Sequence, residues 1–202
     1  MKICITGKPG CGKTYALKYF QSLGCNVFES DKYVNEIYQR NNIGYQLIKK
    51  HFGTKYLNDQ GVDKKKLGAL VFSKPSMLTK LSKIINPLIA KKIKLLDPNK
   101  TWFIELGTYL YYHEYFAKYF DRVMLIFNPK NKQNIIQNKK FSYLKKIPTF
   151  FVDNSNKRKN SLCNIENKIN KKPNINVDYI VDNCHTKKIF EKNLVKFLFL
   201  AN

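Results

Sequence analysis

Arginine, acidic residues, glycine and paired cysteines are all scarce in this sequence of 202 residues. Only three of the 37 basic residues are arginine, and only 14 residues are acidic, so the formal net charge is +23. Such a charge suggests a nucleic-acid partner. However, the lysines are spread along the chain and accompany many Asn and Ile residues, as an AT-rich genome produces. Because a dispersed charge is usually a solvated surface, we expect no specific nucleic-acid partner, and attraction of small anionic substrates instead.

The five cysteines contain no C-x-x-C pair, so the sequence predicts neither a zinc site nor a disulfide framework. We expect buried or incidental reduced thiols, except at Cys11, which lies in a glycine-rich loop where oxidants could reach it. No apolar run approaches the ~18 residues of a membrane span, and the first apolar stretch is too short for a signal peptide. These absences predict a cytoplasmic protein with no membrane partner.

Apolar runs predict five strands, over residues 2–6, 26–29, 102–106, 122–127 and 177–181. Helical spacing predicts helices over 13–23, ended by Gly24, over 32–96 with a break at 52–63, and over 109–118, 131–140 and 187–198. This alternation predicts an α/β fold, in which helices cover both faces of a parallel sheet. We expect a single domain with its core at 1–31, 101–141 and 175–202, a helical substrate-binding insertion at 32–100 and a lid at 142–174.

The stretch "GKPGCGKT" at residues 7–14 matches G-x-x-x-x-G-K-[ST] between a predicted strand and a predicted helix, which indicates a loop that holds a nucleoside triphosphate. Glycines let successive backbone N–H groups turn toward a phosphate, and the helix N-terminus adds partial positive charge. Lys13 is expected to reach the β- and γ-phosphates, and the Thr14 hydroxyl to bind Mg²⁺. The predicted ATP-binding residues are Gly7, Lys8, Pro9, Gly10, Cys11, Gly12, Lys13, Thr14, Tyr15 and, after the last strand, Asn183.

Two carboxylates follow predicted strands. Asp31 lies where α/β sheets place their ligands, so it could take a proton from an attacking hydroxyl, or it could only cap the next helix. Glu105 could hold a Mg²⁺-bound water or be a plain acid at a strand end. The sequence leaves these alternatives open. The tyrosines between 109 and 119 suggest stacking on a ligand ring, but aromatic packing of a helix is the commoner reason for such a run.

Seven stretches of the chain are similar, in order, to the motifs of the dephospho-CoA kinase family: "ITGKPGCGKT", "LGCNVFESDKY", "HFG", "DQGVDKKKLGALVFSKP", "INPLI", "FDRVMLIFNPKNKQ" and "VDYIVDN". The resemblance implies a P-loop kinase of the nucleoside-kinase type, with a parallel five-stranded core, a helical substrate domain and a lid. It also implies transfer of the ATP γ-phosphate to the ribose 3′-hydroxyl of dephospho-CoA. Asp31 would be the base for that hydroxyl, and Lys13 with Mg²⁺ would carry the developing charge.

The chain departs from the family pattern at several charged positions. Asn35 and Lys64 stand where arginine is usual, Asn86 where histidine is usual, and Glu105 where proline is expected. Lysine still attracts phosphate but lacks the bidentate fork of arginine. The expected substrate-binding residues are Asp31, Lys64, Glu105 and Lys140. Two alternatives stay open: another nucleoside or nucleotide kinase with the same core, and a degenerate module that binds ATP without turnover.

Overall fold

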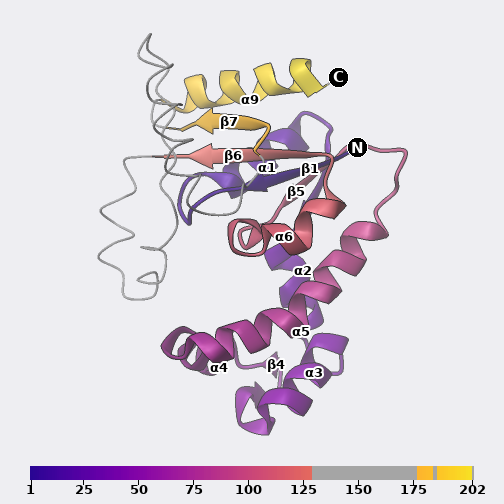
Figure 1. Ribbon diagram of the computed structural model, residues 1–202, viewed down its shortest axis with the longest axis vertical. Coiled ribbons are helices and arrows are strands. Elements are labelled where there is room, and N and C mark those ends of the chain that lie inside the picture. The colour runs from indigo at the N-terminus through magenta and orange to yellow at the C-terminus, as the bar shows by residue number, and fades with distance from the viewer. Residues whose placement is uncertain (129–176, 184–185, 202) are drawn as a thin grey trace. The chain divides into compact units, whose positions relative to one another are not determined.

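A computed structural model of the protein describes residues 1–128, 177–183 and 186–201. Its helices and strands fall into two compact units, one formed by Met1–Phe28 with Pro98–Asn202 and the other by Glu29–Asp97 (Figure 1). The predicted lid at 142–174, the predicted helix at 131–140 and Lys140 lie outside the described residues.

Five strands form one sheet in the order β2-β5-β1-β6-β7, and they lie in the first unit except for Glu29, the last residue of β2. They are β1 (Lys2–Thr6), β2 (Asn26–Glu29), β5 (Trp102–Glu105), β6 (Arg122–Phe127) and β7 (Tyr179–Asp182). The central strand β1 is hydrogen-bonded to a parallel neighbour on each side, with Cys4 opposite Ile104 on β5 and opposite Val123 on β6. β7 extends the sheet parallel to β6. The carboxyl ends of β1, β5, β6 and β7 therefore meet at one edge, and the predicted parallel α/β fold is confirmed.

Two helices cover one face of this sheet, α1 (Lys13–Ser22) and α9 (Lys187–Ala201). Ile3 and Ile5 of β1 point to that face and share a buried core with apolar residues at helical spacing, which are Ala16, Leu17 and Phe20 on α1 and Phe190, Leu194 and Phe197 on α9. Figure 1 shows α9 running alongside β7. The stripe of apolar residues explains why both predicted helices form and which face each buries.

Helix α1 ends as predicted at a glycine. Gly24 has φ +82°, its N–H donates to the carbonyl of Gln21, and the N–H of Cys25 donates to the carbonyl of Phe20. These two bonds form a Schellman motif, which satisfies carbonyl groups that a helix end leaves without partners.

The segment after β5 differs from the single helix predicted over 109–118. It contains η2 (Tyr109–Tyr111), α6 (His113–Phe116) and η3 (Ala117–Tyr119), and the helical path breaks at Tyr112, where φ is −127° and ψ is 31°. The aromatic rings pack on one another, for example Tyr109 against Phe120 with centroids 5.8 Å apart. Aromatic residues have only middling helix propensity, which agrees with an interrupted helical path in this segment. The structure supports the packing explanation for these tyrosines.

The second unit is mainly helical, as predicted for this part of the chain. Its elements are α2 (Ser30–Ile37), α3 (Ile43–Phe52), η1 (Thr54–Tyr56), β3 (Leu57–Asn58), β4 (Gly61–Val62), α4 (Lys64–Ser73) and α5 (Pro75–Lys94). None of the five predicted strands falls within residues 30–97, but β3 and β4 pair as a small antiparallel hairpin within the predicted break at 52–63. Strands of two residues are too short to produce a recognisable alternation of apolar and polar side chains.

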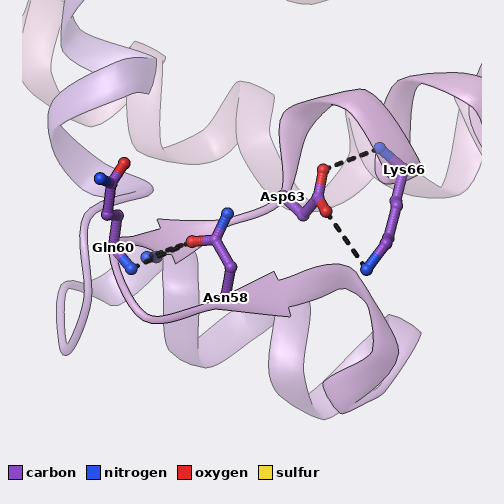
Figure 2. Close-up of polar contacts among 5 residues, drawn as sticks. Asn58, Gln60, Asp63 and Lys66 are labelled. Atoms are coloured by element: carbon purple, nitrogen blue, oxygen red, sulfur yellow. Dashed lines mark hydrogen bonds and ion pairs between the residues drawn. The ribbon is translucent and has the colours of Figure 1, made fainter.

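Polar contacts close this hairpin and begin the next helix (Figure 2). The side-chain oxygen of Asn58 accepts hydrogen bonds from the backbone N–H groups of Gln60 and Gly61, each at 3.0 Å. Asp63 caps α4 by accepting from the backbone N–H of Lys66 at 2.9 Å, and its other oxygen lies 3.4 Å from the Lys66 ammonium. The N–H bond lowers the pKa of Asp63, as expected for a carboxylate at a helix N-cap.

The stacked rings of Phe20 and Phe103 join α1 to the sheet, with centroids 4.0 Å apart and both side chains buried. We predict that Phe20→Ala lowers the free energy of unfolding by about 3–5 kcal/mol, because it leaves a cavity at this junction. Urea unfolding followed by circular dichroism measures the loss. Lys18→Ala on the exposed side of α1 is the control and should change stability by no more than about 0.5 kcal/mol. Equal losses would contradict the assigned core.

Candidate active site

The loop between β1 and α1 is shaped by the strands around it as well as by its own glycines. Gly7 has φ +148°, and a Cβ there would collide with the carbonyl oxygen of Ile126 on β6 and lie 2.7 Å from the Cys11 sulfur. Gly12 has φ +105°, and a Cβ there would collide with the side-chain nitrogen of Asn183, just after β7. Only glycine fits at these two positions without displacing a neighbour.

Lys13 is the first residue of α1, and only 9% of this residue is exposed. Its ammonium group donates a hydrogen bond of 3.0 Å to the backbone carbonyl of Lys8. This bond joins the start of α1 to Lys8, near the beginning of the loop. Lys8 and Pro9 are half-buried, and Gly10 is exposed at the tip.

Thr14 and Glu105 meet beside the loop. The Thr14 hydroxyl lies 3.2 Å and 3.3 Å from the two carboxylate oxygens of Glu105, which is the last residue of β5. Hydroxyl and carboxylate oxygens are the ligands that Mg²⁺ prefers, and nucleotide sites commonly combine one or two such groups with phosphates and water. Within the ranges that the structure describes, no group of three or more His, Cys, Asp or Glu side chains could hold a metal. The Thr14 hydroxyl and the Glu105 carboxylate are therefore compatible with Mg²⁺ bound together with a nucleotide.

Cys11 is buried, with 2% of its surface exposed, and burial raises the pKa of its thiol. The expectation that oxidants could reach it was wrong. Its side chain turns into the protein beside Gly7, while its backbone carbonyl accepts a 2.8 Å hydrogen bond from the Asn183 amide. The sequence pattern did not reveal this contact, because the two residues are 172 positions apart.

Tyr15 connects the start of α1 to α9. Its hydroxyl donates a hydrogen bond to Glu191, its ring lies 5.9 Å from that of Phe190, and the Lys187 ammonium lies 5.3 Å above it. The bond to Glu191 is the main cause of a raised Tyr15 pKa. The side chain of this predicted ATP-binding residue is thus held against α9.

Asp31 lies in the second unit, in the first turn of α2 and two residues after the end of β2. Its side chain is exposed. The N-cap position of α2 belongs to Glu29, so the alternative in which Asp31 only caps the helix was wrong. A carboxylate in the first turn still interacts favourably with the helix dipole.

The second unit also contains an open hollow of about 880 Å³ that includes Lys64. It is lined by Asn35, Tyr38, Gln39, Arg40, Asn58, Gln60, Gly61, Val62, Lys64 and Lys65. Three of these side chains are cationic and none is acidic, so the hollow favours an anion. Arg40 and Lys65 were not singled out in the sequence, because only the fold brings residues from α2, the hairpin and α4 around one space.

Comparison with known proteins decides the family. The model of the dephospho-CoA kinase family matches residues 1–167 of the chain. The chain belongs to the dephospho-CoA kinase family. Curated relatives named dephospho-CoA kinase include one from Mycoplasma genitalium, 36% identical over 77% of this chain and 85% of its own length. Another, from Mycoplasma pneumoniae, is 32% identical over 62% of this chain and 65% of its own length.

Solved structures agree on the fold. A crystal structure from Thermus thermophilus is 18% identical with a TM-score of 0.65, and covers 100% of this chain and 97% of its own. The dephospho-CoA kinase from Campylobacter jejuni is 24% identical with a TM-score of 0.57, and covers 98% of this chain and 96% of its own. The P-loop kinase fold is therefore confirmed. Separately, no helix in the described part of the chain is long and apolar enough to cross a membrane.

Two departures from the family motifs lie together in the second unit. The Lys64 ammonium donates a 3.0 Å hydrogen bond to the side-chain oxygen of Asn35, and both residues stand where the dephospho-CoA kinase motifs usually have arginine. The flexible ammonium of Lys64 and the neutral amide of Asn35 thus stand where the family motifs imply two planar guanidinium groups.

Because the space beside Gly7 is filled by neighbouring atoms, we predict that Gly7→Ala lowers the free energy of unfolding by roughly 2–5 kcal/mol through backbone strain and overpacking. Gly24→Ala is a matched control, since Gly24 also has a positive φ but has no atom within 4 Å of an added Cβ. It should cost only about 1 kcal/mol of strain. Urea unfolding of both variants makes the comparison, and equal losses would contradict the close approach of Ile126 to the loop.

Proposed function

We infer that the protein is an ATP-dependent dephospho-CoA kinase, which transfers the γ-phosphate of ATP to the ribose 3′-hydroxyl of dephospho-CoA and releases CoA and ADP. The observation that carries this conclusion is the family match over residues 1–167, with the phosphate loop intact at its start. Nothing in the comparisons supports another nucleoside or nucleotide kinase.

We propose that the loop from Gly7 to Tyr15 holds the ATP phosphates through its backbone N–H groups and the start of α1. Lys13 leaves the Lys8 carbonyl and reaches the β- and γ-phosphates, where its charge stabilises the transition state. This role is supported by the position of its ammonium group across the loop, 3.0 Å from that carbonyl. Asn183 stays a proposed part of the nucleotide site.

Thr14 and Glu105 are the residues that we propose for Mg²⁺, with Thr14 as direct ligand and Glu105 through water. The Thr14 hydroxyl oxygen lies 3.2 Å and 3.3 Å from the two carboxylate oxygens of Glu105. The two side chains are therefore close enough to serve the same ion beside the loop. Mg²⁺ bound there with ATP would neutralise charge on the phosphates.

For the acceptor, we propose that Asp31 takes the proton of the 3′-hydroxyl as that oxygen attacks the γ-phosphate. Its support is its position in the first turn of α2, two residues after β2, and the exclusion of the cap role. Lys64 is the proposed contact for the anionic part of dephospho-CoA, together with Arg40 and Lys65 of the same hollow. Lys140 and the lid stay predictions from the sequence.

The proposed reaction predicts that the purified protein transfers phosphate from Mg-ATP to dephospho-CoA, and not to nucleosides or nucleoside monophosphates. Chromatography of each acceptor after incubation with ATP measures the product. Lys13→Ala should abolish detectable transfer, whereas Lys18→Ala, an exposed lysine on the same helix, should leave it unchanged. Transfer only to a nucleoside would favour another kinase. ATP binding without transfer to any acceptor would favour the degenerate module.

For Asp31, we predict that Asp31→Asn lowers kcat by roughly 10²- to 10⁴-fold, because a positioned base contributes about that factor. ATP affinity should be retained, and stability should fall by no more than about 1 kcal/mol from the lost helix-dipole interaction. Glu36→Gln, an exposed acid on the same helix, removes the same charge and should keep its turnover. Normal turnover by Asp31→Asn would contradict its role as the base.

A further inference from the structure

The structure assigns Asn183 a role that does not require contact with the nucleotide: we propose that it is a positioning residue, whose amide holds the Cys11–Gly12 peptide of the phosphate loop in its binding orientation. The inference rests on the proposed ATP site and adds to it the residue that orients one of its backbone donors.

A hydrogen bond from Asn183 fixes the orientation of one peptide group of the loop. The Asn183 side-chain nitrogen donates to the Cys11 carbonyl at 2.8 Å, in a half-buried position. A trans peptide group is planar, so its C=O and N–H point in opposite directions. Fixing the Cys11 carbonyl toward Asn183 therefore directs the Gly12 N–H away from Asn183, on the side where a phosphate loop presents its N–H groups to the ligand.

This hydrogen bond requires the open space beside Gly12. A Cβ on Gly12 would collide with the Asn183 side-chain nitrogen and lie 3.5 Å from the Phe190 ring. The amide thus occupies the volume that any side chain at residue 12 would fill. Gly12 and Asn183 are therefore complementary in shape: because Gly12 has no side chain, the Asn183 amide fits beside it and orients the Cys11–Gly12 peptide.

The sheet supports Asn183 rigidly. Asn183 directly follows β7, whose last residue Asp182 is paired with Phe127 of β6 in parallel register. β6 in turn is paired with β1, from which the loop begins. The sheet therefore fixes Asn183 relative to the loop before any nucleotide binds, which lowers the entropy cost of ordering the loop on binding.

The test is Asn183→Ala, measured by steady-state kinetics and by calorimetric titration of Mg-ADP, which does not depend on turnover. We expect KM for ATP and Kd for ADP to rise about three- to tenfold, the effect of one neutral hydrogen bond, with kcat changed by no more than about twofold. Asn183→Ser keeps a shorter donor and should be intermediate. If Asn183→Ala does not fold, the serine variant alone must still show a raised Kd.

The matched control is Asn26→Ala. Asn26 also donates a half-buried amide hydrogen bond to a backbone carbonyl, that of Thr101 at 3.2 Å, but Thr101 precedes β5 at the sheet edge opposite the loop. Its loss should lower the melting temperature without raising Kd. An unchanged Kd in Asn183→Ala, or an equal rise in Asn26→Ala, would overturn the positioning role.

Two further outcomes separate this inference from the proposed function. If Asn183→Asp weakens binding but Asn183→Ala does not, the effect is charge repulsion, and positioning is overturned. If Lys13→Ala binds ADP and turns over like the unchanged protein, the ATP site itself fails. Loss of binding in Lys13→Ala together with unchanged binding in Asn183→Ala would overturn only the role of Asn183.

Discussion

The parallel pairing of β1 with both β5 and β6 is the constraint on which the rest of the structure depends. β1 is bonded on both sides, and its residues Ile3, Cys4 and Ile5 are completely buried. The chain leaves the sheet at the edge where the neighbouring parallel strands also end. Glu105 ends β5, Ile126 lies near the end of β6 and Asn183 follows β7. Each meets a different part of the loop. The order and register of the strands thus determine which residues contact the phosphate loop.

The features that could be predicted from the sequence are those encoded by neighbouring residues. The spacing of Ala16, Leu17 and Phe20 predicted α1, Gly24 predicted its end, and short apolar runs predicted the sheet strands to within two residues. The contacts of Asn183 with Cys11 and of Glu105 with Thr14 join residues 172 and 91 positions apart. No local pattern encodes such pairs. The burial of Cys11 escaped prediction for the same reason, since it depends on which side of the loop faces the core.

The scarcity of arginine affects how this protein can recognise phosphate. A guanidinium group can donate two parallel hydrogen bonds and thereby fix the orientation of a phosphate, whereas an ammonium group acts as a point charge on a flexible chain. Lys64 is instead oriented by its bond to Asn35. The Asn35 amide limits the orientations of the Lys64 ammonium group, as the rigid guanidinium of an arginine would limit its own. Because asparagine is neutral, this arrangement has one positive charge fewer than two arginines would have.

The long separation along the chain between β1 and its partners has a consequence for biosynthesis. Both strands that pair with β1, at Trp102–Glu105 and Arg122–Phe127, are made roughly a hundred residues after it. The helical unit at Glu29–Asp97 is continuous in sequence, so its contacts are more local and form faster. A nascent chain therefore carries an apolar strand with two unpaired edges until β5 has been made, and with one unpaired edge until residue 127 has left the ribosome, a form that is prone to aggregation. Chaperone protection during synthesis would matter most in that interval.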